Sequence, residues 1–277
     1  MNRNERGVPS PAPARVAQNR RSGGRDGMRR GGGGAPAWTP LTSPKGVEVW
    51  LSYAGTTDDG AGLISAWAGQ KTGKIFTAAT TARPTLTASR FGSQPGLVFD
   101  GTTDTMVCST VGALISGNAG LSVIMVYYSA TTAVRVFLEY GSDNVASAGE
   151  FSFVANNVNL GTVYVVARGN IGLTDFYGGV GSAPMTNAGV LAATVDFSLA
   201  TNEVSYSLDG VPISGSRANN SNNTSTFADK PLHLGARNGT LFTPMTLAAV
   251  AVYSTLTSAE LLTEARGLGS IFGVVVA

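Results

Sequence analysis

The sequence predicts an all-β protein with the architecture of an antiparallel β-sandwich. From Trp38 onward, short runs of alternating or apolar residues recur with turn residues between them, which is the pattern of half-buried strands. No helical repeat separates the runs, so parallel βαβ units are not expected. The predicted strands are Val47–Leu51, Gly96–Phe99, Leu121–Tyr128, Val134–Tyr140, Glu150–Val154, Val163–Ala167, Val190–Asp196, Glu203–Leu208, Leu232–Ala236 and Met245–Tyr253.

The segment from Ser205 to Ile213 predicts a β-hairpin. Asp209 and Gly210 follow the first strand, and this pair is typical of a tight turn. Pro212 interrupts the returning strand. Because proline donates no backbone hydrogen bond, we expect that strand at the edge of a sheet.

One helix is predicted near the C-terminal end. Thr257 and Glu260 have the spacing of a capping box, in which the hydroxyl and the carboxylate accept hydrogen bonds from first-turn amides. Apolar residues follow on one face, and glycines are expected to end the helix. The apolar residues are Leu261, Leu262, Ala265 and Leu268, and the glycines are Gly267 and Gly269.

The composition excludes several classes of protein. The 277 residues carry a net charge of only +2, which gives no whole-chain argument for nucleic-acid binding. Apolar runs such as that from Leu121 to Tyr128 are far shorter than the roughly 20 residues of a membrane span. The single cysteine, Cys108, and the single histidine, His233, exclude an intrachain disulfide and multi-cysteine or multi-histidine metal sites. We expect no cofactor.

Charge is concentrated in residues 1–36, an arm rich in arginine, glycine and proline. The arm holds eight arginines against two acids, or +6, whereas the rest of the chain holds 11 basic and 15 acidic side chains, or −4. Such a segment has too little apolar surface to fold alone, so we predict an extended anchoring arm at 1–36 and a folded domain at 37–277. The predicted partner-binding residues are Arg3, Arg6, Arg15, Arg20, Arg21, Arg25, Arg29, Arg30 and the apolar anchor Trp38.

Three uses of the arm stay open: docking on an acidic protein surface, contact with nucleic acid, or a solvated tail. Docking is favoured because arginine forms bidentate hydrogen bonds with carboxylates. Nucleic acid is disfavoured because the arm lacks aromatic residues for base stacking. No apolar segment follows the charges, so a secretory signal is not expected.

The sequence offers little evidence of catalysis. Glycoside hydrolysis needs two carboxylates about 5–9.5 Å apart, but Glu139, Glu150, Glu203 and Asp196 each stand alone in their predicted strands. Glycoside cleavage by two carboxylates that come from different strands remains an open alternative. His233 alternates with two leucines and no nucleophile elbow is present, so it is interpreted as an ordinary strand residue. Cys108 is interpreted as a buried, inert thiol.

Three pairs of residues with oxygen-bearing side chains are candidate calcium ligands. None matches an EF-hand loop, and each is better explained by turns in which Asp and Asn bind their own backbone. The pairs are Asp58 with Asp59, Asp100 with Asp104, and Asp143 with Asn144.

Several segments, taken in order, resemble one family. They are Ile64–Trp67, Ala82-Arg83-Pro84-Thr85-Leu86, Gln94–Asp104, Leu232–Arg237, and Leu247–Tyr253 followed by Ser254–Glu260. In this order and spacing they resemble concanavalin A-like (laminin G-like) jelly-roll domains over about residues 45–272. The resemblance implies a jelly roll in which Phe99 lies in the core and Tyr253 ends the last long strand.

The chain also departs from the family pattern. The usual Asp-x-Ser-Gly after the tryptophan is replaced by Ala68–Gly73, and Thr103 replaces the first acid of the Asp-Asp pair. Metal ligands are therefore not transferred from the family.

The resemblance, together with the low charge and the arm, favours a structural protein of a tailed bacteriophage virion. The preferred role is a capsid decoration or head-fibre protein on the particle exterior, docked through the arm and without enzyme activity. A tail fibre or glycan-binding receptor protein is the alternative, and a glycan-cleaving enzyme is the third. We also expect a homo-oligomer. The predicted glycan-binding residues are Tyr177, Asn220, Asn222 and Phe242.

Overall fold

The computed structural model describes residues 39–129, 131, 133–141, 147–156, 162–170, 173–177, 188–213 and 223–277. These residues form two antiparallel sheets with a hydrophobic core between them, which confirms the predicted all-β sandwich. They belong to one compact unit, Trp38–Ala277. The predicted arm boundary at residue 36 lies outside the described residues and stays a prediction.

Sheet A contains eight strands in the described residues, in the order β15-β14-β13-β8-β17-β6-β5, with β1 also paired to β17. The long strands β8 and β17 pair with each other at the centre of the sheet, and β8 also pairs with β13. The strands are β1 (Gly46–Leu51), β5 (Thr85–Phe91), β6 (Gln94–Asp100), β8 (Gly120–Ser129), β13 (Ala188–Asp196), β14 (Val204–Leu208), β15 (Val211–Pro212) and β17 (Pro244–Ser254).

Sheet B contains nine strands in the described residues, in the order β12-β11-β10-β9-β16-β7-β4-β3-β2. Its centre is built by β9, β10 and β16, which come from distant parts of the sequence. The strands are β2 (Thr56–Asp58), β3 (Ile64–Ala68), β4 (Ile75–Thr77), β7 (Met106–Cys108), β9 (Arg135–Tyr140), β10 (Glu150–Asn156), β11 (Thr162–Arg168), β12 (Leu173–Tyr177) and β16 (Leu232–Leu234).

The main core fills the space between the sheets. Phe99 of sheet A and Phe151 and Phe153 of sheet B all belong to it, and each is at most 1% exposed. Because strand side chains alternate between faces, Ser152 lies on the outer face of sheet B. Phe99 is thus a core residue, as the family resemblance implied.

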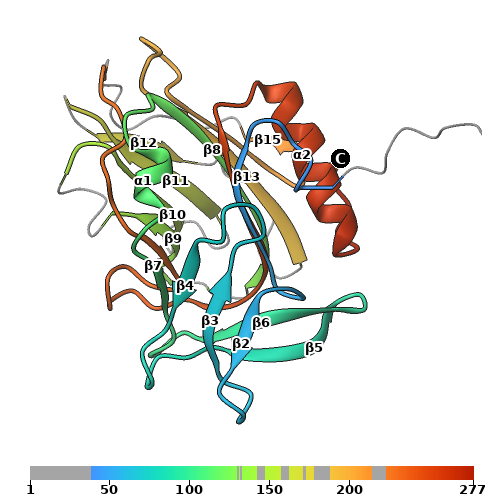
Figure 1. The fold of residues 1–277 in the computed structure, drawn as a ribbon. Coiled ribbons are helices and arrows are strands. Elements are labelled where there is room, and N and C mark those ends of the chain that lie inside the picture. Colours follow the sequence, from blue (N-terminus) through green and yellow to red (C-terminus); the bar gives the residue numbers. More distant parts are fainter. Residues whose placement is uncertain are drawn as a thin grey trace, which may run out of the picture. The chain divides into compact units, whose positions relative to one another are not determined.

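Helix α2 (Ser258–Ile271) covers the outer face of sheet A. Figure 1 shows it beside the sheet that holds β13 and β15, and it contacts β13 and β8. The helix begins as predicted, because Thr257 and Glu260 form both hydrogen bonds of a capping box. Its apolar face packs on small side chains of the sheet in a second core, which includes Leu261, Ala265, Leu268, Ala249 and Ala251.

The predicted end of this helix is wrong. Helix α2 continues through Gly267 and Gly269 to Ile271. A Cβ at Gly269 would lie 2.9 Å from Val276 and 3.1 Å from Val190. The glycine at this position therefore permits close packing instead of ending the helix.

A short helix and several strands were not predicted. They include the four-residue helix α1 (Gly112–Ile115) and strands β2, β4, β5 and β12. The Asp209–Gly210 hairpin is confirmed, since both residues have positive φ and β15 forms the sheet edge. No helix in the described residues is long and apolar enough to cross a membrane.

Candidate functional site

Polar side chains occupy the centre of the outer face of sheet B. Ser152 on β10 lies opposite Glu139 on β9, and Glu139 lies opposite His233 on β16. Neighbouring residues on each strand, such as Phe151, Tyr140 and Leu232, belong to the main core. The alternation that fills the core thus directs Ser152, Glu139 and His233 to the other face.

A second row of charged residues runs beside the first. Arg168 on β11 lies opposite Glu150 on β10. The Glu150 side chain lies over Gly141, where a Cβ would be only 2.5 Å from its Cδ. Gly141 has a φ of +126°, a conformation that other residues rarely adopt. Its backbone N–H donates to Pro231 O, beside Lys230.

Two cations cover two buried carboxylates in these rows. Arg237 Nε lies 3.2 Å from Glu139 Oε1, and Lys230 Nζ lies 3.2 Å from Glu150 Oε1. The glutamate side chains are fully buried, whereas those of Arg237 and Lys230 are 22% and 28% exposed. A buried carboxylate needs a partner because desolvation is costly. The arrangement therefore leaves cationic groups at the surface above the acids.

Two polar atoms in the first row have no hydrogen-bond partner within the described part of the chain. They are His233 Nε2 and Ser152 Oγ, in residues that are 6% and 0% exposed. Burial lowers the pKa of His233, so its imidazole is neutral at neutral pH. Unpaired buried polar atoms cost free energy, and a ligand would relieve that cost. We define Ser152, Arg168, Lys230, His233 and Arg237 as the sheet B site.

The order of these residues excludes a serine hydrolase triad. A triad needs the histidine between the serine and the acid, but here Glu139 lies between Ser152 and His233. Two strand spacings separate Ser152 from His233, or about 10 Å. His233 is therefore a strand residue that alternates with core leucines, as predicted.

The carboxylates Glu139 and Glu150 are brought together across strands. Glu139 pairs with Ser152, and Glu150 precedes Ser152 by two residues on the same face. Such diagonal neighbours lie about 7 Å apart, within the range of glycosidase carboxyl pairs. The sequence shows each acid alone, and only the strand register places them together.

The predicted glycan-binding residues are spread over several segments. Phe242 is half-buried in the loop between β16 and β17. Tyr177 lies in β12 opposite Tyr164 of β11, on the same sheet as the sheet B site. Asn220 and Asn222 lie outside the described residues, as do Trp38 and the arginines of the arm.

The sequence analysis missed Ser152, Arg168, Lys230 and Arg237. The available signal was a polar residue between two aromatic core residues, as in Phe151-Ser152-Phe153. A single outward serine is common on any half-exposed sheet. Only the pairing of the strands shows that Ser152 lies in a row with Glu139 and His233.

The acidic pairs within the described residues have the predicted turn roles. Asp58 accepts hydrogen bonds from the N–H groups of Gly60 and Gly62, and Asp100 accepts from those of Thr102, Thr103 and Asp104. No group of three or more metal-ligating side chains occurs in the described residues. Asp143 and Asn144 lie outside them. Cys108 is buried in β7, and burial raises the pKa of its thiol.

Comparison with known proteins gives a structural result only. No protein-family model and no curated protein sequence matches the chain. Among solved structures, Trypanosoma rangeli sialidase matches with a TM-score of 0.54 and 14% identity, over 82% of this chain and 33% of that one. The same sialidase with 2,3-difluoro-KDN gives 0.55 and 14%, over 84% and 34%, and with sialic acid 0.54 and 13%, over 82% and 33%.

The similarity is to sialidase β-sandwich domains. At this identity it establishes the concanavalin A-like type of fold, and the chain spans about a third of the length of those sialidases. It also corrects the sequence-based function. The prediction of a bacteriophage virion structural protein is wrong, because the structural neighbours are sialidases, one of them with sialic acid bound.

Proposed function

We propose that the chain is a glycan-binding β-sandwich that binds acidic glycans at the sheet B site. The observation that carries the proposal is the set of surface cations above buried carboxylates, next to two unpaired buried polar atoms. Arginine binds a carboxylate through two parallel hydrogen bonds, and Ser152 and His233 provide groups for sugar hydroxyls. Helix α2 covers the outer face of sheet A, which also favours sheet B as the binding face.

The proposal is tested by isothermal titration calorimetry with 3′-sialyllactose and lactose, two probes that differ in one acidic sugar. We expect tighter binding of sialyllactose. Arg168→Gln removes a cation for which the described residues provide no ion pair, and it should weaken sialyllactose binding at least about ten-fold, since hydrogen bonds to charged groups contribute about 1.5–3 kcal/mol.

The control is Arg266→Gln, the same substitution on helix α2 over the opposite sheet. It should leave sialyllactose binding unchanged. Equal affinity for the two probes, or an equal loss in both variants, would overturn the proposal.

Glycan cleavage is a second candidate function, favoured by the position of Glu139 and Glu150 on adjacent strands of one face. Incubation of the protein with 3′-sialyllactose tests it through release of lactose, measured by chromatography. Release that Glu150→Gln abolishes would support an enzyme. Binding without release would support a binding module.

A further inference from the structure

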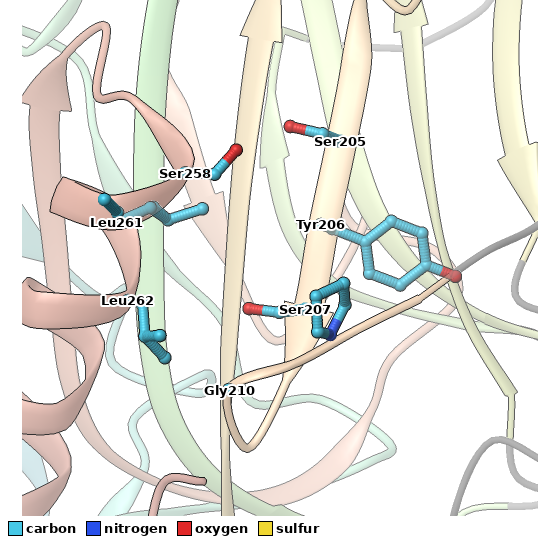
Figure 2. Close-up of a pocket in the computed structure, with 9 residues that line it drawn as sticks. Ser205, Tyr206, Ser207, Gly210, Ser258, Leu261 and Leu262 are labelled. Atoms are coloured by element: carbon cyan, nitrogen blue, oxygen red, sulfur yellow. The ribbon is translucent and has the colours of Figure 1, made fainter.

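A groove lies between helix α2 and the β14–β15 hairpin, on the opposite side of the sandwich from the sheet B site. It consists of two adjoining pockets, each of about 280 Å³, that share Ser205 and Ser258. Figure 2 shows one of them, with Ser205 and Ser207 on the strand and Leu261 and Leu262 on the helix. This volume is enough for a small polar molecule.

The floor of the groove consists of serine side chains, because β14 alternates between faces. Val204 and Tyr206 point into the main core, so Ser205 and Ser207 point outward. Ser207 is only 9% exposed, its hydroxyl points into the groove in Figure 2, and it has no partner in the described part of the chain. The hydroxyl is therefore free to donate to, or accept from, a molecule bound in the groove.

The second pocket adds acceptors at one end of the groove. Asp196 Oδ1 accepts hydrogen bonds from the backbone and side chain of Ser198, and its other oxygen binds nothing in the described residues. Asn202 and Glu203 also line this end, and Glu203 is held by Asn223. Among the described residues that line the two pockets, none has a basic side chain.

The other end of the groove is apolar. Leu261, Leu262 and Pro212 line it beside Gly210. The groove thus combines hydroxyls, two carboxylates and an aliphatic wall. A sugar ring matches this set, because its hydroxyls donate to carboxylates and its C–H groups pack on aliphatic side chains.

We propose that this groove binds a neutral saccharide, as a second glycan site independent of the sheet B site. The two sites differ in charge. Surface cations mark the sheet B site, whereas Asp196 and Glu203 would repel an acidic sugar from the groove.

The test is NMR titration of the full chain with D-glucose, D-galactose and D-mannose, and with N-acetylneuraminic acid for contrast. We expect at least one neutral sugar to shift the backbone amide signals of Ser205, Ser207 and Ser258, and the acidic sugar to leave them in place. Absence of these shifts with all three neutral sugars would overturn the proposal. Equal shifts with the acidic sugar would overturn it as well.

A double variant tests whether the saccharide binds in the groove itself. Ser205→Val with Ser207→Val removes two hydroxyls and fills the floor, and valine suits a strand. We expect affinity to fall about 30-fold or more, since two hydrogen bonds are lost. The control Thr87→Val on β5, outside the groove, should bind normally. An unchanged affinity in the double variant would refute the proposal, and circular dichroism verifies that both variants are folded.

Discussion

Glu48 gives the sharpest prediction about what holds the fold together. Its side chain comes from β1 and is fully buried. Oε1 accepts hydrogen bonds from the N–H groups of Val49 (3.0 Å) and Lys71 (2.7 Å). Oε2 accepts from the N–H groups of Thr72 and Lys74, both at 3.0 Å, and from the Thr72 hydroxyl. One carboxylate thus organises the loop 69–74 after Trp67.

The substitution Glu48→Gln preserves shape but replaces one oxygen with an amide that cannot accept. Either oxygen accepts at least two of the hydrogen bonds. Hydrogen bonds to charged groups contribute about 1.5–3 kcal/mol each, so we expect a loss of about 3–6 kcal/mol in the free energy of unfolding. That loss is a large part of a typical domain stability of about 5–15 kcal/mol.

Urea unfolding at pH 7 measures this loss directly. A second readout is trypsin cleavage after Lys71 and Lys74, which should become faster when the loop loses its anchor. The control is Glu260→Gln, since the Glu260 side chain is 42% exposed in its ion pair with Lys45, and most of the stability should remain. If Glu48→Gln costs less than about 1 kcal/mol, the hydrogen bonds to the Glu48 carboxylate do not organise the loop.

Two further predictions concern Gly141 and Asp104. Gly141→Ala places a Cβ at a φ of +126° against the Glu150 side chain. The substitution should lower the free energy of unfolding by about 1–3 kcal/mol and weaken sialyllactose binding. Calorimetry measures both stability and affinity, and wild-type values for both would contradict the packing argument. Burial, with repulsion from Asp100, raises the pKa of Asp104 to about 6, above the value of about 4 in the unfolded chain. The folded state then holds a proton that the unfolded state has released, so stability should fall as pH rises from about 4 to 6 and level off above. Asp104→Asn should remove this slope in urea unfolding series, and an unchanged slope would assign it to another group.

Much of the fold was predictable because its signals are local. The apolar runs Leu121–Tyr128 and Val190–Asp196 predicted strands, and strands occupy Gly120–Ser129 and Ala188–Asp196. The Asp209–Gly210 turn and the Thr257 cap depend on neighbouring residues alone, and both are confirmed. Strand β5 was missed because Thr85–Phe91 is rich in polar residues and its pairing with β6 defines it.

The candidate sites were less predictable because they depend on contacts between distant segments. Glu139 and Glu150 could be noted as single acids, but their shared face follows from the pairing of β9 with β10. Glu48 was missed for the same reason, since its partners lie more than 20 residues further along the chain.

The sequence by itself determined the all-β class, many of the strands, one hairpin and the start of one helix, since apolar patterning, turn chemistry and capping act over a few residues. Only the tertiary structure decided which polar residues meet. Strand register sets Ser152, Glu139 and His233 in one row, and the packing of α2 on sheet A forms the groove beside Ser205 and Ser207. Pairing between strands far apart in sequence is a property of the whole folded chain, so no local pattern could specify it.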